Sequence, residues 1–287
     1  MCGIAGIISA DGRASMRLGA EALSQIAHRG PDGAYLWNDG PAVMGTCRLA
    51  IVNVDGGIQP AFNETGDVVA VFNGEIYNHR ELRTELSSRG HKIAEGSDIE
   101  VLPHALEEWG LDFPKHLNGQ FGIAIWNRHT RELILARDRV GMKPLFFATA
   151  RNGDLVFGSE VKSLFAHPGI ERRIDERSVA QIFTLWTVVD SFSPFAGVQQ
   201  VEAGSVYRFG PDRELKEQRK YWDIPFSGDL PALDIDFQTA KEAFRDELKR
   251  AVDLRLRADV PVGTYTSGGI DSSVVNVVAQ KELNHSN

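Results

Sequence analysis

The chain has 287 residues, 43% of them hydrophobic and 24% charged, which is typical of a globular protein of about two domains. Its 39 acidic and 31 basic residues give a formal net charge of −8 without long runs of like charge, which argues against nucleic acid or an anionic membrane as the main partner. The two cysteines follow no secretory signal, and no apolar stretch is long enough to cross a bilayer. We therefore expect a cytoplasmic protein with free thiols.

The first seven residues, MCGIAGI, place Cys2 directly after the initiator methionine. Methionine is usually trimmed before a small side chain, and trimming leaves Cys2 with a free α-amine beside its own thiol. Because an α-amine has a pKa of about 7.7–8.0, it can serve as the base for that thiol, as in N-terminal nucleophile catalysis. The structural alternative is that Cys2 is a small buried residue opening an apolar strand.

Apolar spacing and turn residues predict alternating helices and strands along the first two thirds of the chain. The predicted elements are a strand over 4–8, a helix over 15–27 stopped by residues 29–33, strands over 42–44, 48–52 and 68–72, helices over 81–89 and 101–109, a hairpin of 122–126 and 132–136, a strand over 155–158 and a helix from Val161. The eight histidines show no spacing typical of a zinc site, and they give such a site little support. Many antiparallel pairs indicate an α+β layered unit.

Asn73-Gly74-Glu75 follows the predicted strand over 68–72. Asn-Gly between two periodic segments is a turn signal, and this structural explanation is sufficient by itself. The functional alternative is that the Asn73 side chain and the Gly74 backbone amide are two donors for an oxyanion in acyl transfer. The pattern leaves both interpretations open.

Ser97-Asp98-Ile99-Glu100 precedes the helix that ends near Trp109. Ser97 and Glu100 fit a capping box, which explains the tetrad without a ligand. Asp98 is not needed for the box, so its carboxylate could instead face a substrate ammonium.

At this point the residues carry a family resemblance. The strings MCGIAGI, HRGPDG, RLAIV, FNGEIYNHREL, SDIE, ARDRVGMKPLFF and FGSEVKSL, in this order, resemble the glutaminase domain of class II glutamine amidotransferases. The later string VPVGTYTSGGIDSSV resembles the pyrophosphate loop of glutamine-hydrolysing asparagine synthetases. The resemblance implies an N-terminal nucleophile domain, an αββα sandwich, joined to an α/β ATP-pyrophosphatase domain.

The resemblance also implies roles for individual residues. Cys2 would be the nucleophile with its amine as base, and Asn73 and Gly74 would form the oxyanion hole. Arg48 would hold the α-carboxylate of glutamine, and Asp98 would hold its α-ammonium together with Gly74 and Glu75. Ammonia would then pass inside the protein to a second site. The full implied glutamine site is Arg48, Leu49, Ala50, Ile51, Val52, Asn73, Gly74, Glu75 and Asp98.

Four positions depart from the family pattern: Thr46, Cys47, Asn53 and Ile99. None of them removes an implied catalytic group. Thr46 and Cys47 precede Arg48, however, and we expect them to alter its surroundings and hence the affinity for glutamine.

The last third is predicted to hold a connector and the start of a second domain. Thr239 and Glu242 fit a capping box for a helix, and a strand over 260–266 leads through Ser267-Gly268-Gly269-Ile270-Asp271-Ser272-Ser273 into another helix. A strand, a Gly-Gly turn and a helix can bind phosphate through backbone N–H groups. The same string could equally be an ordinary βα turn. The implied ATP site is Ser267, Gly268, Gly269, Asp271, Ser272 and Ser273, with Asp271 as a ligand for Mg²⁺.

The expected organisation is a glutaminase domain with connector over residues 2–210, a linker over 211–237 and the beginning of an ATP-binding domain over 238–287. Too few residues follow Ser273 to complete an α/β nucleotide domain, so we expect a truncated chain.

The resemblance implies a glutamine-dependent asparagine synthetase that adenylates aspartate, with glutamine, aspartate and ATP as partners. ATP and Mg²⁺ would serve the second domain, and the glutaminase domain would need no cofactor. The oligomeric state is open, with a homodimer as one option. A relative acting on another carboxylate, such as a sugar acid or cell-envelope precursor, is the main alternative, and a non-catalytic ligand-sensing module is the third.

Overall fold

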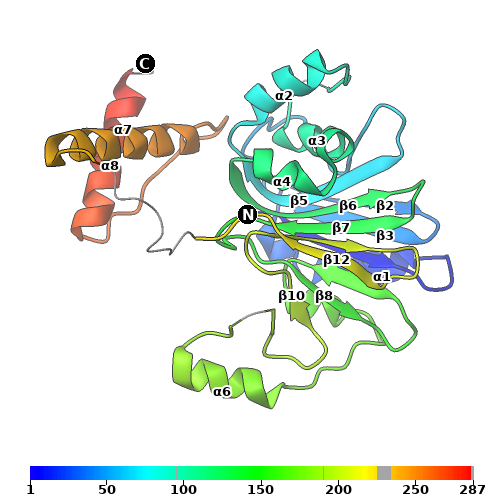
Figure 1. Ribbon diagram of the computed structural model, residues 1–287. Coiled ribbons are helices and arrows are strands. Elements are labelled where there is room, and N and C mark those ends of the chain that lie inside the picture. The colour runs from blue at the N-terminus through cyan, green and yellow to red at the C-terminus, as the bar shows by residue number, and fades with distance from the viewer. Residues whose placement is uncertain (95, 190, 225–233, 286–287) are drawn as a thin grey trace. The chain divides into compact units, whose positions relative to one another are not determined.

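The structure is a computed structural model that describes residues 1–94, 96–189, 191–224 and 234–285 (Figure 1). It divides into two compact units. The first consists of residues 1–50 and 55–223, and the second of residues 51–54 together with the chain from residue 224 onward. Across the described residues, no helix is both long enough and apolar enough to cross a membrane.

Two antiparallel sheets of six strands each form the centre of the first unit. The first sheet contains, in spatial order, β10 (Gln199–Gln200), β8 (Phe146–Thr149), β9 (Leu155–Gly158), β1 (Gly3–Ile8), β3 (Ala42–Arg48) and β2 (Gly33–Asp39). The second sheet contains β12 (Leu215–Lys220), β11 (Ser205–Phe209), β7 (Glu132–Arg137), β6 (Gly119–Asn127), β5 (Val68–Ile76) and β4 (Ala61–Phe62).

Alternation along β5 explains why the sheets stack, since successive side chains of a strand point to opposite faces. Val69 and Val71 belong to the core between the two sheets, together with Ile4 and Met44 of the first sheet. Phe72 belongs instead to the core between the second sheet and the helices that cover it. A strand that is apolar on both faces therefore lies between two layers.

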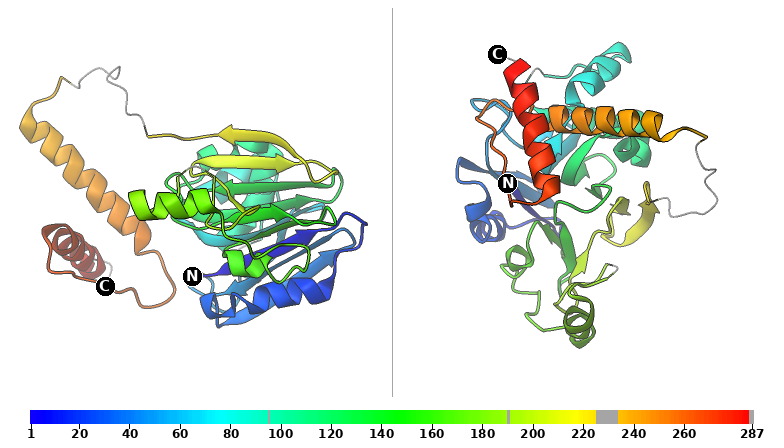
Figure 2. Two further views of the ribbon diagram at one scale, coloured as in Figure 1. Left: turned by 90° about the horizontal axis from the view of Figure 1, so that it is seen from below. Right: turned by 90° about the vertical axis from the view of Figure 1, so that its left-hand side faces the viewer.

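Helices cover the outer face of each sheet. The outer face of the second sheet carries α2 (His79–Ser88), α3 (Val101–Trp109) and α4 (Phe113–His116), as Figure 1 shows. The outer face of the first carries α1 (Met16–Ser24) and α5 (Val161–Leu164); α1 is the blue helix in the left view of Figure 2. The predicted αββα sandwich is confirmed. The remaining helices of this unit are η1 (Ala27–Arg29), η2 (Asp98–Glu100), η3 (Gly110–Asp112) and α6 (Glu176–Leu185).

The predicted strand over 48–52 is wrong, because β3 ends at Arg48. The next two N–H groups bind side chains instead of a neighbouring strand: Leu49 N–H donates to Cys2 Sγ (3.3 Å) and Ala50 N–H donates to Asp32 Oδ2 (2.8 Å). The strand β2 was not predicted. The run Ala34-Tyr35-Leu36-Trp37 was a strand signal that the prediction missed, because it follows directly on the turn residues 29–33.

The turn predicted at Asn73-Gly74 is also wrong, since both residues lie inside β5. The ladder between β5 and β6 continues past them to the pair Ile76 and Gly119. A Cβ atom on Gly74 would lie 2.2 Å from the Gln120 carbonyl oxygen, so glycine here permits a close approach of two strands.

Neither predicted capping box forms. Ser97 makes no capping bond, and its hydroxyl donates to Asp98 Oδ1 (3.1 Å). The helix predicted from Thr239 is α7 (Phe237–Arg255), capped by Asp236, whose carboxylate accepts from the N–H groups of Gln238 and Thr239. A carboxylate is the stronger acceptor for a helix N-terminus, and it displaces the hydroxyl.

The linker predicted over 211–237 begins too early. Residues 215–220 form β12, an edge strand whose side chains are mostly charged and therefore gave no apolar pattern. The last residue of the predicted linker, Phe237, is the first residue of α7. Residues 225–233 of the predicted linker lie outside the described residues.

The second unit contains α7 and α8 (Ile270–His285), in agreement with the two predicted helices. The strand predicted over 260–266 is wrong, because no residue of that segment belongs to a strand or a β-bridge. A parallel strand is stable only between neighbours, and no strand occurs in the part of this unit that the structure describes.

Candidate active site

Cys2 lies immediately before β1, with its thiol against the segment that follows β3. Its Sγ accepts a hydrogen bond from Leu49 N–H (3.3 Å) and lies 3.5 Å from the Leu49 carbonyl oxygen. Met1 is present, so the nitrogen of Cys2 is a peptide nitrogen that stands where a free α-amine would be after trimming. Burial raises the pKa of the Cys2 thiol, while the Leu49 N–H and Arg48 act in the opposite direction.

Two side chains hold the Cys2 carbonyl oxygen. Arg29 Nε donates to it at 2.9 Å. The Asn73 side-chain amide has the orientation that satisfies both of its polar atoms, and in this orientation its Nδ2 donates to the Cys2 carbonyl oxygen at 2.8 Å. The Asn73 Oδ1 then accepts from Arg29 Nη2 (3.2 Å), and Glu160 Oε1 pairs with Arg29 Nη1 (2.9 Å). An amide nitrogen carries two N–H groups, and the bond to Cys2 uses one of them.

Arg29 and Glu160 were absent from the predicted site. Arg29 lies in the string HRGPDG and Glu160 in the string FGSEVKSL, and both strings carried the family resemblance. A charged residue inside a family string was the signal that could have pointed to each of them. Glu160 follows Ser159, whose hydroxyl accepts from Ile4 N–H (3.0 Å) and whose own N–H donates to the Ile4 carbonyl (2.9 Å). These two bonds fix the Glu160 segment beside the strand that begins at Cys2.

The segment from Arg48 to Ala50 is held in place by the HRGPDG string. Asp32 N–H donates to the Arg48 carbonyl (3.0 Å), and Asp32 Oδ2 accepts from Ala50 N–H (2.8 Å). A Cβ atom on Gly30 would lie 2.3 Å from the Cys47 carbonyl group. The turn can therefore press against this segment only with glycine at position 30.

A guanidinium and a carboxylate lie near the Cys2 thiol. Arg48 is 8% exposed, and the charges of Arg48 and Asp98 act in opposite directions on the pKa of Cys2. A Cβ atom on Gly57 would lie 2.8 Å from Arg48 Nη2 and 3.1 Å from Ser97 Oγ, so the guanidinium lies close to the Ser97-Asp98 pair. The two groups suit the carboxylate and the ammonium of a free amino acid.

Asp98 is 4% exposed, and its carboxylate accepts two hydrogen bonds from neutral donors. Its Oδ2 accepts from Ile76 N–H (2.9 Å), and its Oδ1 accepts from the Ser97 hydroxyl (3.1 Å). Burial raises the pKa of Asp98 despite these bonds. A cationic ligand would stabilise this buried carboxylate.

Three other predicted site residues are Glu75, Ile51 and Val52. Glu75 lies in β5 beside Gly74, and its charge is felt by Lys143, whose pKa is lowered chiefly by burial. Ile51 and Val52 belong to the second unit, where the Ile51 carbonyl accepts from Asp259 N–H (2.9 Å). The structure therefore brings together Cys2, Arg48, Leu49, Ala50, Asn73, Gly74 and Asp98 in the first unit.

The unusual residues before Arg48 have partners of their own. Thr46 donates its hydroxyl to the Gly3 carbonyl (3.1 Å), and Cys47 Sγ lies 3.4 Å from the Leu23 carbonyl oxygen, in the core beneath α1. Ile99 is fully buried beneath the helices of the second sheet. Asn53 adopts a positive φ of 52°.

The predicted phosphate-binding string forms the turn into α8. Gly268 has a φ of 86°, the Ser272 hydroxyl accepts from Ser267 N–H (3.2 Å), and the Ser273 hydroxyl donates to the Gly269 carbonyl (2.8 Å). Asp271 lies exposed in the first turn of α8.

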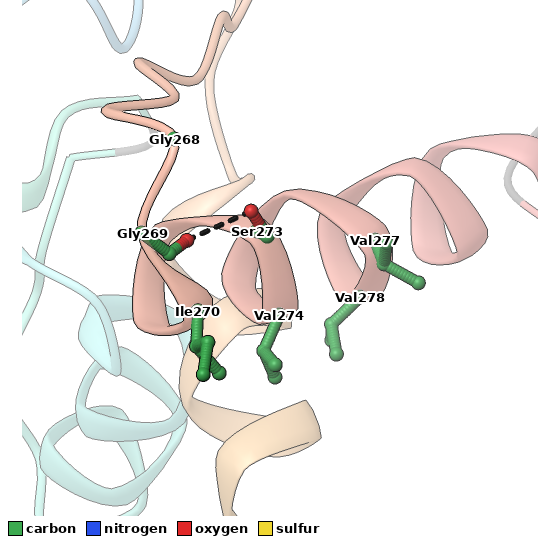
Figure 3. Close-up of a pocket in the computed structure, with 7 residues that line it drawn as sticks. All are labelled: Gly268, Gly269, Ile270, Ser273, Val274, Val277 and Val278. Carbon is green, nitrogen blue, oxygen red and sulfur yellow. Dashed lines mark hydrogen bonds between the residues drawn. The ribbon is translucent and has the colours of Figure 1, made fainter.

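A pocket of about 380 Å³ adjoins this turn. Figure 3 shows the side chains of Ile270, Val274 and Val278, which line the pocket, projecting from the same side of α8. The residues around the pocket are Gly268, Gly269, Ile270, Ser273, Val274, Val277 and Val278. The wall of the pocket is mostly aliphatic. Among the described lining residues, hydrogen-bond donors for a phosphate come only from the Gly268-Gly269 turn and Ser273.

Comparisons with known families and proteins give matches over most of the chain. Residues 1–222 match the glutamine amidotransferase domain family, and residues 243–286 match the asparagine synthase family. Asparagine synthetase [glutamine-hydrolyzing] 3 of Bacillus subtilis is 37% identical over 257 residues, which are 88% of this chain and 41% of that protein. Amidase chry2 of Gibberella zeae is 37% identical over 290 residues, which are 96% of this chain and 42% of that protein.

This chain thus spans less than half the length of these two relatives. Among solved structures, the glutamine phosphoribosylpyrophosphate amidotransferase of B. subtilis matches with a TM-score of 0.55 and 17% identity, over 98% of this chain and 64% of that one. That likeness shows the class II amidotransferase fold. The family match over most of the chain shows that it belongs to the family of glutamine amidotransferase domains, and that an asparagine synthase domain begins after it.

Proposed function

We propose that this chain hydrolyses glutamine to glutamate and ammonia at Cys2. The thiol attacks the side-chain amide carbon, and the amine of trimmed Cys2 takes the thiol proton and passes it to the departing ammonia. Water then cleaves the resulting thioester and releases glutamate. The raised pKa of the thiol supports a mechanism that needs a base, because such a thiol is mostly protonated at neutral pH.

Binding of glutamine would use the two charges beside the thiol. Arg48 would pair with the α-carboxylate and Asp98 with the α-ammonium, which leaves the side-chain amide to reach Cys2. The observation that carries this proposal is the burial of the Asp98 carboxylate, which accepts its two hydrogen bonds from neutral donors, the Ile76 N–H and the Ser97 hydroxyl. A buried carboxylate in that state gains most from a cationic ligand.

The oxyanion of the tetrahedral intermediate would be met by the second N–H of Asn73 and by the backbone N–H of Gly74. Arg29 would act indirectly. It holds the Cys2 carbonyl and the Asn73 amide, and Glu160 holds Arg29. This chain of bonds orients both the nucleophile and the oxyanion donor before glutamine arrives.

Replacing Asp98 by asparagine is expected to raise KM for glutamine by about 10–100-fold. The change removes one charge-assisted contact, worth about 1.5–3 kcal/mol. Steady-state measurement of glutamate release would show this rise with kcat changed much less. Glu100→Gln, on the same short helix, is the matched control and should leave KM unchanged. An unaltered KM in Asp98→Asn would contradict the assignment of Asp98 to the ammonium.

As part of a longer protein, we propose that the chain supplies ammonia to an ATP-dependent domain that makes asparagine. Bound ATP would supply the adenylyl group that activates the aspartate side chain, and AMP and pyrophosphate would be released. The described residues fit this in part: the turn from Ser267 to Ser273 opens α8, and Asp271 offers one carboxylate for Mg²⁺. The match of residues 243–286 to the asparagine synthase family supports the proposal.

A second acceptor remains open because of one finding. The relative named amidase chry2 is as similar to this chain as the asparagine synthetase 3 of B. subtilis, at 37% identity in both cases. The longer protein could therefore amidate a carboxylate other than aspartate, including a sugar acid. AMP release by a full-length parent, measured with aspartate and with other carboxylates, distinguishes the two acceptors.

Residues 1–287 alone are expected to hydrolyse glutamine but to make no asparagine. In the second unit, Val277 is 55% exposed and Ile270 is 82% exposed, which indicates a helix without the sheet that such residues cover. Calorimetry should show that a glutamine analogue raises Tm, because a ligand that binds only the native state stabilises it. Millimolar ATP should give no shift, and a clear response to ATP would contradict this prediction.

A further inference from the structure

Two histidines and two glutamates lie close together around α3. Glu64 lies in the turn between β4 and β5, His91 follows the end of α2, and His104 and Glu107 lie three residues apart on α3. One ligand atom from each residue can be chosen so that all lie within 4.8 Å of one another. The cluster takes no part in the site around Cys2.

The separations approach those of a tetrahedral metal site. His104 Nδ1 lies 3.3 Å from His91 Nδ1 and 3.3 Å from Glu64 Oε2. Metal–ligand bonds of about 2.0–2.1 Å give a tetrahedron with edges of about 3.4 Å. The two edges at His104 already have that length, and the carboxylates need only adjust their rotatable side chains to shorten the others.

The groups behind these atoms are arranged as an outer shell. His91 points its second nitrogen, Nε2, at Glu108 Oε2 (3.4 Å), the carboxylate–imidazole pairing common behind metal-bound histidines. Glu64 Oε1 accepts from Lys92 N–H (2.5 Å), and Glu107 Oε1 accepts from the side chain of Asn63 (2.7 Å). Each carboxylate thus has one oxygen held by the protein and a second oxygen for a metal ion.

Burial and charge also suit a cation. His104 is 1% exposed, so its imidazole faces the other three side chains of the cluster and little water. The side chain of Glu64 is 29% exposed, so the cluster is reached from water on one side. Two carboxylates would neutralise a divalent ion, and imidazole nitrogen with carboxylate oxygen is a donor set that zinc accepts.

We propose that Glu64, His91, His104 and Glu107 bind one divalent first-row transition-metal ion, zinc in the first instance. The ion would join the β4–β5 turn, the segment after α2 and the middle of α3. Its role would be structural, because all four positions are supplied by the protein and none lies beside Cys2. The site could not be recognised from a His-x-x-x-His spacing in the sequence, because its ligands come from three separate segments.

The test is calorimetric titration of the chelator-treated chain with Zn²⁺. It is carried out in the Cys2→Ala variant so that the nucleophilic thiol cannot contribute a ligand. We expect one ion per chain with a Kd of about 1 µM or tighter, a Tm that rises with added Zn²⁺, and visible d–d absorption of tetrahedral Co²⁺ when cobalt replaces zinc. Binding weaker than about 100 µM in the titration would overturn the proposal.

Single variants locate the ion. His91→Gln and Glu107→Gln alter partly exposed side chains, so both proteins should fold, and each should weaken binding by about 100-fold or more and abolish the Co²⁺ spectrum. His129→Gln, in the exposed turn between β6 and β7, is the matched control and should bind as the parent does. Undiminished binding in His91→Gln, with the fold verified by Tm, would mean that any bound ion lies elsewhere.

Discussion

Replacement of Cys2 by alanine is expected to abolish the release of glutamate from glutamine, by on the order of 10⁴-fold or more. The thiol is the proposed attacking atom, and no other described side chain of the site can replace it. The second cysteine provides a matched control. Cys47 is buried beneath α1 with its Sγ 3.4 Å from the Leu23 carbonyl, so Cys47→Ala should retain activity and lose only some stability.

An uncleaved N-terminal tag should have the same effect as Cys2→Ala although it leaves the thiol intact. A tag converts the proposed base into a peptide nitrogen, and burial has raised the pKa of the thiol that needs this base. Burial lowers the pKa of the Met1 amine, and the amine of a trimmed Cys2 would lie one residue closer to the buried strand β1. A lowered pKa leaves more of an amine neutral at pH 7, as a base requires.

Mass spectrometry of the untagged protein, to confirm loss of Met1, accompanies the assay of glutamate release. In a full-length parent, ammonia-dependent synthesis should survive both changes, because it bypasses the glutaminase site. Substantial glutaminase activity in a protein that retains its tag would contradict the role of the amine and leave Cys2 with a different base.

The layered fold could be predicted because its strands and helices are marked by local patterns. The apolar run at residues 4–8 and the hairpin of β6 and β7 appear where the sequence indicated. The edge strand β12 could not be found in this way, since a polar strand is stabilised only by its ladder with β11. The strand expected over 260–266 failed for the converse reason: its apolar pattern is present, but the described residues of its unit include no neighbouring strand.

The site illustrates the same limit. Asn73 and Gly74 were singled out as donors at a tight turn, yet they lie in the middle of β5. The strand reaches the site because Gly74 lets β6 pass closely, a long-range contact that the dipeptide itself does not reveal. Arg29 and Glu160, separated by 131 residues, meet only through the pairing of β1 with β9 and the turn at Ser159.

Replacing Asn73 by alanine is expected to lower kcat by about 10²–10³-fold, the usual loss for one oxyanion donor. The structure predicts a second, smaller effect. Asn73 is fully buried and donates to the Cys2 carbonyl, so its loss should also lower stability by about 1 kcal/mol, while Arg29 still holds that carbonyl at 2.9 Å. Single-turnover kinetics and thermal unfolding measure the two effects separately.

Asn73→Asp tests the oxyanion role with an added charge. An aspartate can still accept from Arg29, but its carboxylate cannot donate to the Cys2 carbonyl, so we expect a loss of stability at least as large as in Asn73→Ala. In the tetrahedral intermediate the same negative charge would face the developing oxyanion, so kcat should fall at least as far as in Asn73→Ala. If both variants lost thermal stability but kept kcat, Asn73 would only be holding the Cys2 carbonyl, and the oxyanion would have to be met by the Gly74 N–H and other groups.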